Sequence, residues 1–228
     1  MNTVLRRLPF AIFALLVIGV GVAAVLPYAT FDPANFNNAT RRFAVETPLR
    51  QLNLYLHAFG GGLALLLGVT QFITRLRVRR PVLHRWLGRI YLIAVLLASL
   101  SAFVIAPGTR GGFSGEVGLL MLAVLWLITG FMAYRTIRRG DVAQHREWML
   151  RNYALTFGAV TLRLWLGVLI MTQVPQLMTR YGGNFDALFD TVYPVVMWLA
   201  WVPNLIAMEW WLNRRRMFKR TLVAGAEA

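Results

Sequence analysis

The sequence contains no cysteine among its 228 residues, only nine acidic residues and only three histidines. The absence of cysteine excludes disulfides, iron–sulfur clusters and thiolate metal sites, and it leaves the redox compartment open. The few acids are scattered, and no Ser-His pair, paired aspartates or HExxH motif has the spacing of an intramembrane protease. Hydrolytic catalysis is therefore not expected.

Long apolar stretches dominate what is present. Hydrophobic residues make up 58% of the chain, and the mean hydropathy is +0.57, which is too apolar for an ordinary soluble domain. A membrane-spanning helix needs roughly 20 apolar residues, and only helices or closed barrels satisfy their backbone groups in hydrocarbon. Six runs reach this length without the alternation of barrel strands: residues 8–27, 49–73, 86–106, 117–134, 148–171 and 192–212.

These runs predict an all-α, polytopic membrane protein with six transmembrane helices. We expect a single membrane domain over residues 1–228, in which residues 1–48 hold the first span and an outer loop. Residues 49–171 would form a four-helix core, and residues 172–228 an outer loop, the sixth span and a basic tail. The first run could also be a signal peptide, but it is longer than the usual apolar region of about 7 to 15 residues, which favours a retained anchor.

Positive charge falls almost entirely on one side of these spans. Five of the 24 Lys and Arg residues lie on the other side: Arg41, Arg42, Arg50, Arg110 and Arg180. Eighteen lie on the first side, grouped at residues 6–7, 75–89, 135–151 and 214–220. The positive-inside rule then places both termini in the cytoplasm, and we expect a multi-pass protein of the bacterial cytoplasmic (inner) membrane. Partners would be anionic lipid headgroups, with a membrane protein partner or a homo-oligomer as further possibilities. The net charge of +15 would suggest nucleic acid in a soluble protein, but the spans exclude that class.

Polar and small residues recur at helical spacing on three of the predicted spans. The stripe of the second span is His57, Gly61, Ala64, Gly68 and Gln71. The third span carries His84, Gly88, Tyr91 and Val95, and the fifth carries His145, Asn152, Thr156 and Arg163. Residues three and four apart share a helix face, and polar side chains avoid lipid. The three stripes are therefore expected to face one another in a core of spans two to five.

Arg163 lies within the fifth span, where an arginine costs about 2.5 to 3.5 kcal/mol on insertion scales. One interpretation is an outward-facing polar pocket for an anion, a quinone head or a proton, lined by His57, Asn152, Thr156 and Arg163. The alternative is that Arg163 extends toward the outer interface or bonds to backbone carbonyls. Glu209 has the opposite charge but lies at a different depth.

Several motifs resemble a bacterial family of predicted membrane proteins called domain of unknown function 2306. They are His57-x-x-Gly60-Gly61, Leu65-Leu66-Leu67-Gly68-x-x-Gln71-Phe72, Leu83-His84-Arg85-x-x-Gly88-Arg89-x-Tyr91 and His145-Arg146-x-Trp148-Met149-x-Arg151. The resemblance covers about residues 51–163. It implies a membrane protein and no particular reaction.

A looser architectural similarity connects six helices with inward histidines to cytochrome b561-type proteins. This resemblance implies one haem b with His84 and His145 as axial ligands, and with nearby arginines for its propionates: Arg85, Arg89, Arg146 and Arg151. That family uses two histidine pairs, whereas the fourth span offers no partner for His57, so at most one haem would fit.

Three functions therefore remain open. The first is a single-haem redox or haem-binding protein. The second is a small transporter or an anion- or quinone-binding bundle with the outward pocket. The third is an accessory or scaffold subunit whose arginines at residues 75–80 bind lipid or a partner.

Overall fold

The computed structural model describes residues 3–36, 40 and 47–224, and every regular element in these ranges is helical. The longer helices are α1 (Thr3–Val25), α3 (Pro48–Gln71), α5 (Pro81–Ile105), α6 (Gly112–Arg138), α7 (Val142–Thr156), α8 (Gly158–Gln173), α10 (Phe185–Leu199) and α11 (Val202–Ala224). Short helices are η1 (Leu26–Tyr28), η2 (Pro33–Asn35), α4 (Thr74–Arg79), η3 (Val174–Gln176) and α9 (Leu177–Tyr181). The all-α prediction is confirmed for these ranges.

Six helical stretches of the described chain are long and apolar enough to cross a membrane, as the sequence predicts. They are Phe10–Tyr28, Pro48–Gln71, Pro81–Ile105, Gly112–Arg138, Val142–Tyr181 and Phe185–Phe218. Of the outer arginines counted above, Arg41 and Arg42 lie outside the described residues.

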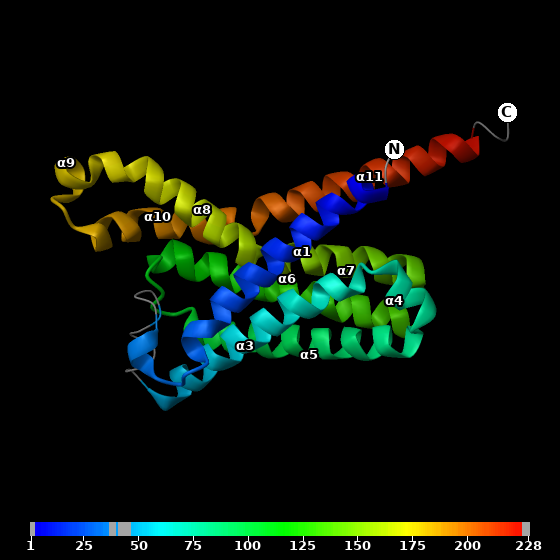
Figure 1. Cartoon of the computed structure of the whole chain (residues 1–228), viewed down its shortest axis with the longest axis horizontal. Helices are drawn as coiled ribbons and strands as arrows, with labels where there is room; N and C mark the ends of the chain where they lie inside the picture. The colour runs from blue at the N-terminus through cyan, green and yellow to red at the C-terminus, as the bar shows by residue number, and fades with distance from the viewer. Residues whose placement is uncertain (1–2, 37–39, 41–46, 225–228) are drawn as a thin grey trace.

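The core consists of α3, α5, α6 and α7, with α1 lying across α3 (Figure 1). Small residues on the facing surfaces allow close packing: Ala64 on α3 and Ala98 on α5 are fully buried. Packing of this kind replaces the hydrophobic driving force between helices in lipid. The predicted core of spans two to five is therefore confirmed for α3, α5 and α6, and for α7, which is the first half of the fifth span.

Residues 49–171 were expected to form a four-helix core, but the second half of the fifth span does not continue in this bundle. The chain breaks at Phe157 and continues as α8, which leaves the bundle and packs against α10 (Figure 1). The sixth span breaks beside it, between α10 and α11. Pro203 contributes to this second break because it lacks the N–H that would bond to the carbonyl of Leu199.

Side chains across the two breaks satisfy the carbonyls that the breaks release. The Thr161 hydroxyl of α8 donates to the Ala200 carbonyl at 2.5 Å. The Asn204 amide of α11 donates to the carbonyls of Ala154 and Ala200, at 3.3 and 3.0 Å, and to the Thr161 hydroxyl at 2.9 Å. Since unpaired carbonyls are costly in hydrocarbon, each broken span depends on the other.

The arginine-rich segments gather at one end of the molecule. The start of α1, the end of α11, the short helix α4 and the turn between α6 and α7 all lie toward the right in Figure 1. Asp141 caps α7 there by accepting a hydrogen bond from the Gln144 backbone N–H at 2.9 Å. The orientation of this arginine-rich end toward the cytoplasm stays a prediction.

At the opposite end, Arg110 clamps α10 to the loop between α5 and α6. Its guanidinium donates to Asp190 at 2.7 Å and to Asp186 at 2.8 Å, and it lies over the Phe189 ring. The hydrogen bond to Asp190 raises the pKa of Arg110, so the guanidinium stays charged.

Arg110→Gln is expected to lower the free energy of unfolding by about 1 kcal/mol, because both carboxylates are largely exposed and such pairs contribute little each. The measurement is thermal unfolding in detergent. Arg180→Gln is the matched control, because Arg180 lies over its neighbour Tyr181. Equal melting temperatures for the two variants would contradict the clamp.

Candidate functional site

A closed polar network crosses the centre of the core between α5, α6 and α7. The Tyr91 hydroxyl donates to Asn152 Oδ1 at 2.5 Å and lies 2.9 Å from Thr156 Oγ1. The Asn152 amide donates to the Trp126 carbonyl and to Thr129 Oγ1, both at 2.8 Å. The Trp126 indole donates to Thr156 Oγ1 at 2.9 Å. All five residues are buried.

Asn152 and Thr156, predicted as ligand-binding residues, lie together as expected. Their side chains bond to other members of this network, and Thr156 Oγ1 also donates to the Asn152 carbonyl at 2.9 Å. A network in which every group has a partner holds the helices in register. Their role in binding a ligand stays a prediction.

His57 and Arg163, the other two residues of the predicted outward pocket, lie apart from this network. His57 Nδ1 donates to the Ala98 carbonyl of α5 at 2.9 Å, which joins α3 to α5. Arg163 is exposed on α8 and donates to the Ala159 carbonyl of its own helix at 2.7 Å. The alternative that Arg163 bonds to backbone carbonyls is therefore confirmed. The four residues do not converge on one cavity.

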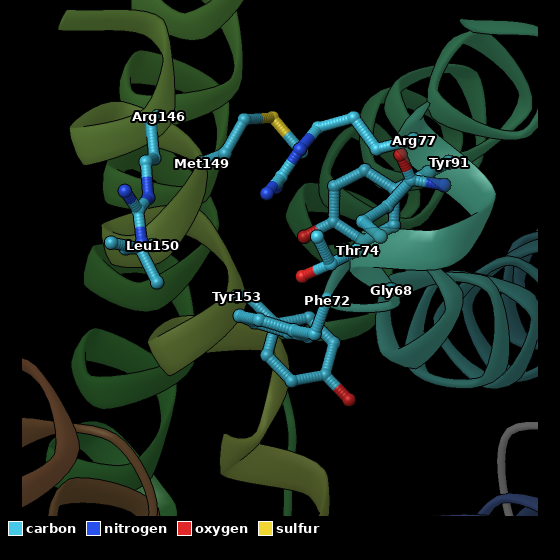
Figure 2. Close-up of a pocket in the computed structure, with 10 residues that line it drawn as sticks. Gly68, Phe72, Thr74, Arg77, Tyr91, Arg146, Met149, Leu150 and Tyr153 are labelled. Carbon is cyan, nitrogen blue, oxygen red and sulfur yellow. The ribbon is translucent and has the colours of Figure 1, made fainter. Parts of the chain in front are cut away.

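A cavity of about 140 Å³ lies near the arginine-rich end, between α3, α4, α5 and α7 (Figure 2). Gly68 and the buried rings of Tyr91 and Tyr153 form part of its wall. A Cβ atom on Gly68 would lie 2.1 Å from Tyr153 Cε2 and 3.1 Å from Tyr91 Cε2. Glycine at this position therefore lets both rings approach α3.

The polar side chains of the cavity come from three helices. Gln71 ends α3, Thr74 and Arg77 belong to α4, and Arg146 belongs to α7. In Figure 2 the Arg77 side chain extends across the cavity toward Met149, and Arg146 lies on the α7 wall. Phe72 and Leu150 add apolar surface, so the lining is amphipathic.

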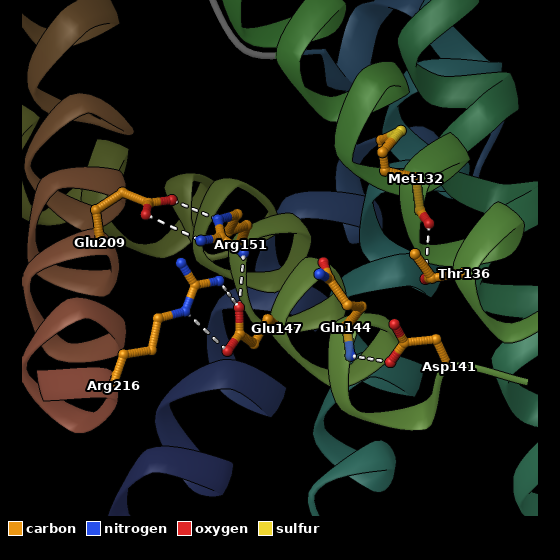
Figure 3. A network of polar contacts seen from close by, with 8 residues as sticks. All are labelled: Met132, Thr136, Asp141, Gln144, Glu147, Arg151, Glu209 and Arg216. Atoms are coloured by element: carbon orange, nitrogen blue, oxygen red, sulfur yellow. Dashed lines mark hydrogen bonds and ion pairs between the residues drawn. The ribbon is translucent and has the colours of Figure 1, made fainter. Parts of the chain in front are cut away.

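Acidic side chains near this end are bonded elsewhere (Figure 3). Arg151 is buried and makes two hydrogen bonds to Glu209 of α11, at 2.5 and 3.0 Å. Glu147 pairs with Arg216 and lies 3.7 Å from Arg151. Arg151 also lies over the Trp148 ring, 4.8 Å from its centroid. This ion network joins α7 to α11.

Arg151 was predicted to neutralise a haem propionate, but in the structure it pairs with the carboxylates of Glu209 and Glu147. Of the other arginines assigned to the propionates, Arg89 lies over the Trp86 ring, 5.1 Å from its centroid. Arg146 lines the cavity described above, whereas Arg85 does not.

The two predicted haem ligands are His84 and His145. His84 lies close enough to His145 and to Arg77 for their charges to interact. His145 Nδ1 donates to the Ala133 carbonyl at 2.8 Å, but the buried Nδ1 of His84 has no hydrogen-bond partner in the described part of the chain. Metal-ligating histidines almost always donate their second nitrogen to a partner.

Neither histidine lines the cavity described above. The neighbouring cavity, at about 140 Å³, is below even the roughly 300 Å³ at which pockets for drug-sized ligands begin. Among the described residues, no three or more His, Cys, Asp or Glu side chains are grouped so that they could hold a metal ion. The structure therefore gives the haem prediction no support.

The sequence reasoning missed the cavity itself. It placed Gly68, Gln71 and Tyr91 on inward stripes and treated the arginines of residues 75–80 as one surface cluster. The sequence did contain one signal of this site, because Gln71 lies at the end of the second span and just before this arginine cluster. The sequence does not show that Arg146, 69 residues beyond Arg77, lies at the same cavity.

Comparison with known proteins places this site within a family. No curated protein and no solved structure matches the chain. A family model described as "Predicted membrane protein (DUF2306)" matches residues 54–212, which is more than half of the chain and includes every residue that lines the cavity. The resemblance seen in the sequence motifs is thereby confirmed, and the chain belongs to the family of predicted membrane proteins called domain of unknown function 2306.

Proposed function

We propose that this membrane protein binds the phosphate group of an anionic ligand in the cavity between α3, α4, α5 and α7. The observation that carries the proposal is the presence of Arg77 and Arg146 at one cavity, with no carboxylate partner for either in the described ranges. We further propose that this end faces the cytoplasm, in line with the distribution of arginine.

The charge balance favours an anion supplied from outside the chain. The described acids nearest to this end are Asp141, Glu147 and Glu209. Asp141 caps α7, and the two glutamates hold Arg151 and Arg216. Because these acids are engaged, the guanidinium groups of Arg77 and Arg146 are open to an anion from outside the chain.

The polar groups beside the arginines suit phosphate. Guanidinium groups match the oxygens of phosphate with parallel N–H bonds, and the Gln71 amide and the Thr74 hydroxyl can add neutral hydrogen bonds. A carboxylate offers two oxygens to such a set, whereas phosphate offers three or more. The small volume limits the occupant to a compact group.

Arg77→Gln and Arg146→Gln are each expected to weaken binding of inorganic phosphate about tenfold, the loss for one charge-assisted contact in a partly exposed site. The measurement is isothermal titration of the purified protein in nanodiscs of neutral lipid. Arg79→Gln and Arg138→Gln remove the same charge from α4 and α6 without touching the cavity lining.

We expect these two control variants to bind within twofold of the original protein, since a general surface potential changes affinity only weakly at physiological salt. If all four variants lose affinity equally, the arginines act as a diffuse charge and the proposed site is wrong. If none of them changes the affinity, phosphate binds elsewhere.

A further inference from the structure

We infer that the phosphate group belongs to a membrane lipid with an unsubstituted phosphate head, of the phosphatidate type. This inference rests on the proposed function and adds the class of molecule that carries the phosphate. Three features of the cavity lead to it: its depth along the spans, the apolar surface beside it, and its charge and size.

The cavity lies where the spans end. Gln71 is the last residue of α3 and Thr74 is the first of α4, so the polar lining begins as the second span stops. Trp86 on α5, close to the same end, is 56% exposed. Exposed tryptophans mark the headgroup level of a bilayer. The phosphate of a lipid that stays in the bilayer would therefore lie at the depth of Arg77 and Arg146.

An apolar surface runs from the cavity toward the first span. The Phe72 ring lines the cavity and is 38% exposed. It lies 5.0 Å from Tyr153 and 6.4 Å from Phe13 of α1, measured between ring centroids. Phe13 lies 6.4 Å from Phe10, which is 41% exposed. A soluble phosphate makes no apolar contact with these rings, whereas an acyl chain that covers them removes apolar surface from water, which favours binding.

Charge and size together select the head group. A phosphate monoester carries about −1.5 to −2 charges near pH 7, which matches two guanidinium groups, while a diester carries only one. The cavity of about 140 Å³ holds little more than a phosphate group, so a sugar or a second glycerol would extend beyond its lining. A phosphate with no substituent fits both limits.

The test compares four probes on the full-length protein by competition in neutral nanodiscs: dioleoyl phosphatidate, dioleoyl phosphatidylglycerol, dioleoyl phosphatidylcholine and glycerol 3-phosphate. We expect phosphatidate to bind at least about tenfold more tightly than each of the others, in keeping with one additional charge contact or a buried chain segment. Arg77→Gln and Arg146→Gln should remove most of that preference, and Arg79→Gln and Arg138→Gln should keep it.

The outcomes separate the lipid inference from the proposed function. Equal, arginine-dependent binding of glycerol 3-phosphate and phosphatidate would overturn the lipid inference and leave phosphate binding intact. Equal binding of phosphatidylglycerol and phosphatidate would overturn the choice of a monoester. If the affinity of every probe is unchanged by both Arg77→Gln and Arg146→Gln, the proposed site is wrong. Because both arginines are exposed, their variants should fold, and unchanged elution on size exclusion checks this.

Discussion

Gly68→Ala is expected to lower the free energy of unfolding by about 2–3 kcal/mol, the upper range for overpacking a close contact. The added Cβ would lie 2.1 Å from Tyr153 Cε2 and 2.4 Å from Tyr153 Cδ2. Tyr153 cannot turn away freely, because its ring packs against Phe13 and Phe72 and its hydroxyl donates to the Leu65 carbonyl at 3.2 Å. The ring must move into the cavity, so phosphate binding should fall as well.

The control lies two turns earlier on the same helix. Gly61→Ala adds the same methyl group where no heavy atom lies within 4 Å, so it should leave stability unchanged or raise it by up to about 1 kcal/mol. The measurement is chemical unfolding in detergent, followed by tryptophan fluorescence. A Gly68→Ala variant as stable as Gly61→Ala would show that the rings do not pack against α3 as described.

Glu209→Leu is expected to cost about 2–3 kcal/mol, because it leaves the buried guanidinium of Arg151 without its bidentate partner. Removal of one member of a fully buried pair costs about 3–5 kcal/mol, and Glu209 is partly exposed, which reduces the effect. Glu147, at 3.7 Å from Arg151, compensates in part.

The double variant Arg151→Met with Glu209→Leu should recover at least half of that loss, since an apolar pair of similar volume needs no counter-charge. A double-mutant cycle by thermal unfolding measures the coupling. Arg216→Gln serves as the exposed comparison, because it removes an ion-pair partner of Glu147 near the surface and leaves Arg151 and Glu209 in place. If the double variant is less stable than Glu209→Leu alone, Arg151 stabilises the protein through packing and not through the ion pair.

The sequence predicted the number of spans and the inward faces of α3 and α5, because charge distribution and helical spacing are local patterns. His57, Gly68 and Tyr91 were all expected to face the core, and each contacts it. The departure of α8 could not be predicted in this way. Gly158 alone does not break a helix, and the break is stable because Asn204 and Thr161 satisfy the released carbonyls of Ala154 and Ala200.

The cavity could not be predicted from the sequence either, because it also depends on tertiary contacts. Arg77 is one of four arginines within residues 75–80, and nothing local distinguishes it from Arg79. Its difference arises from the fold, which brings α4 to α7 beside Arg146 and directs the nearby glutamates to Arg151 and Arg216. Which arginine lacks an acidic partner is a tertiary property.

The most direct measurement is an experimental density map of the protein in nanodiscs that contain phosphatidate. The account predicts one phosphate group in the cavity between α3, α4, α5 and α7, with its oxygens about 3 Å from the guanidinium groups of both Arg77 and Arg146. A cavity without phosphate density, with ordered lipid phosphates only at other arginines such as Arg79 or Arg138, would contradict it.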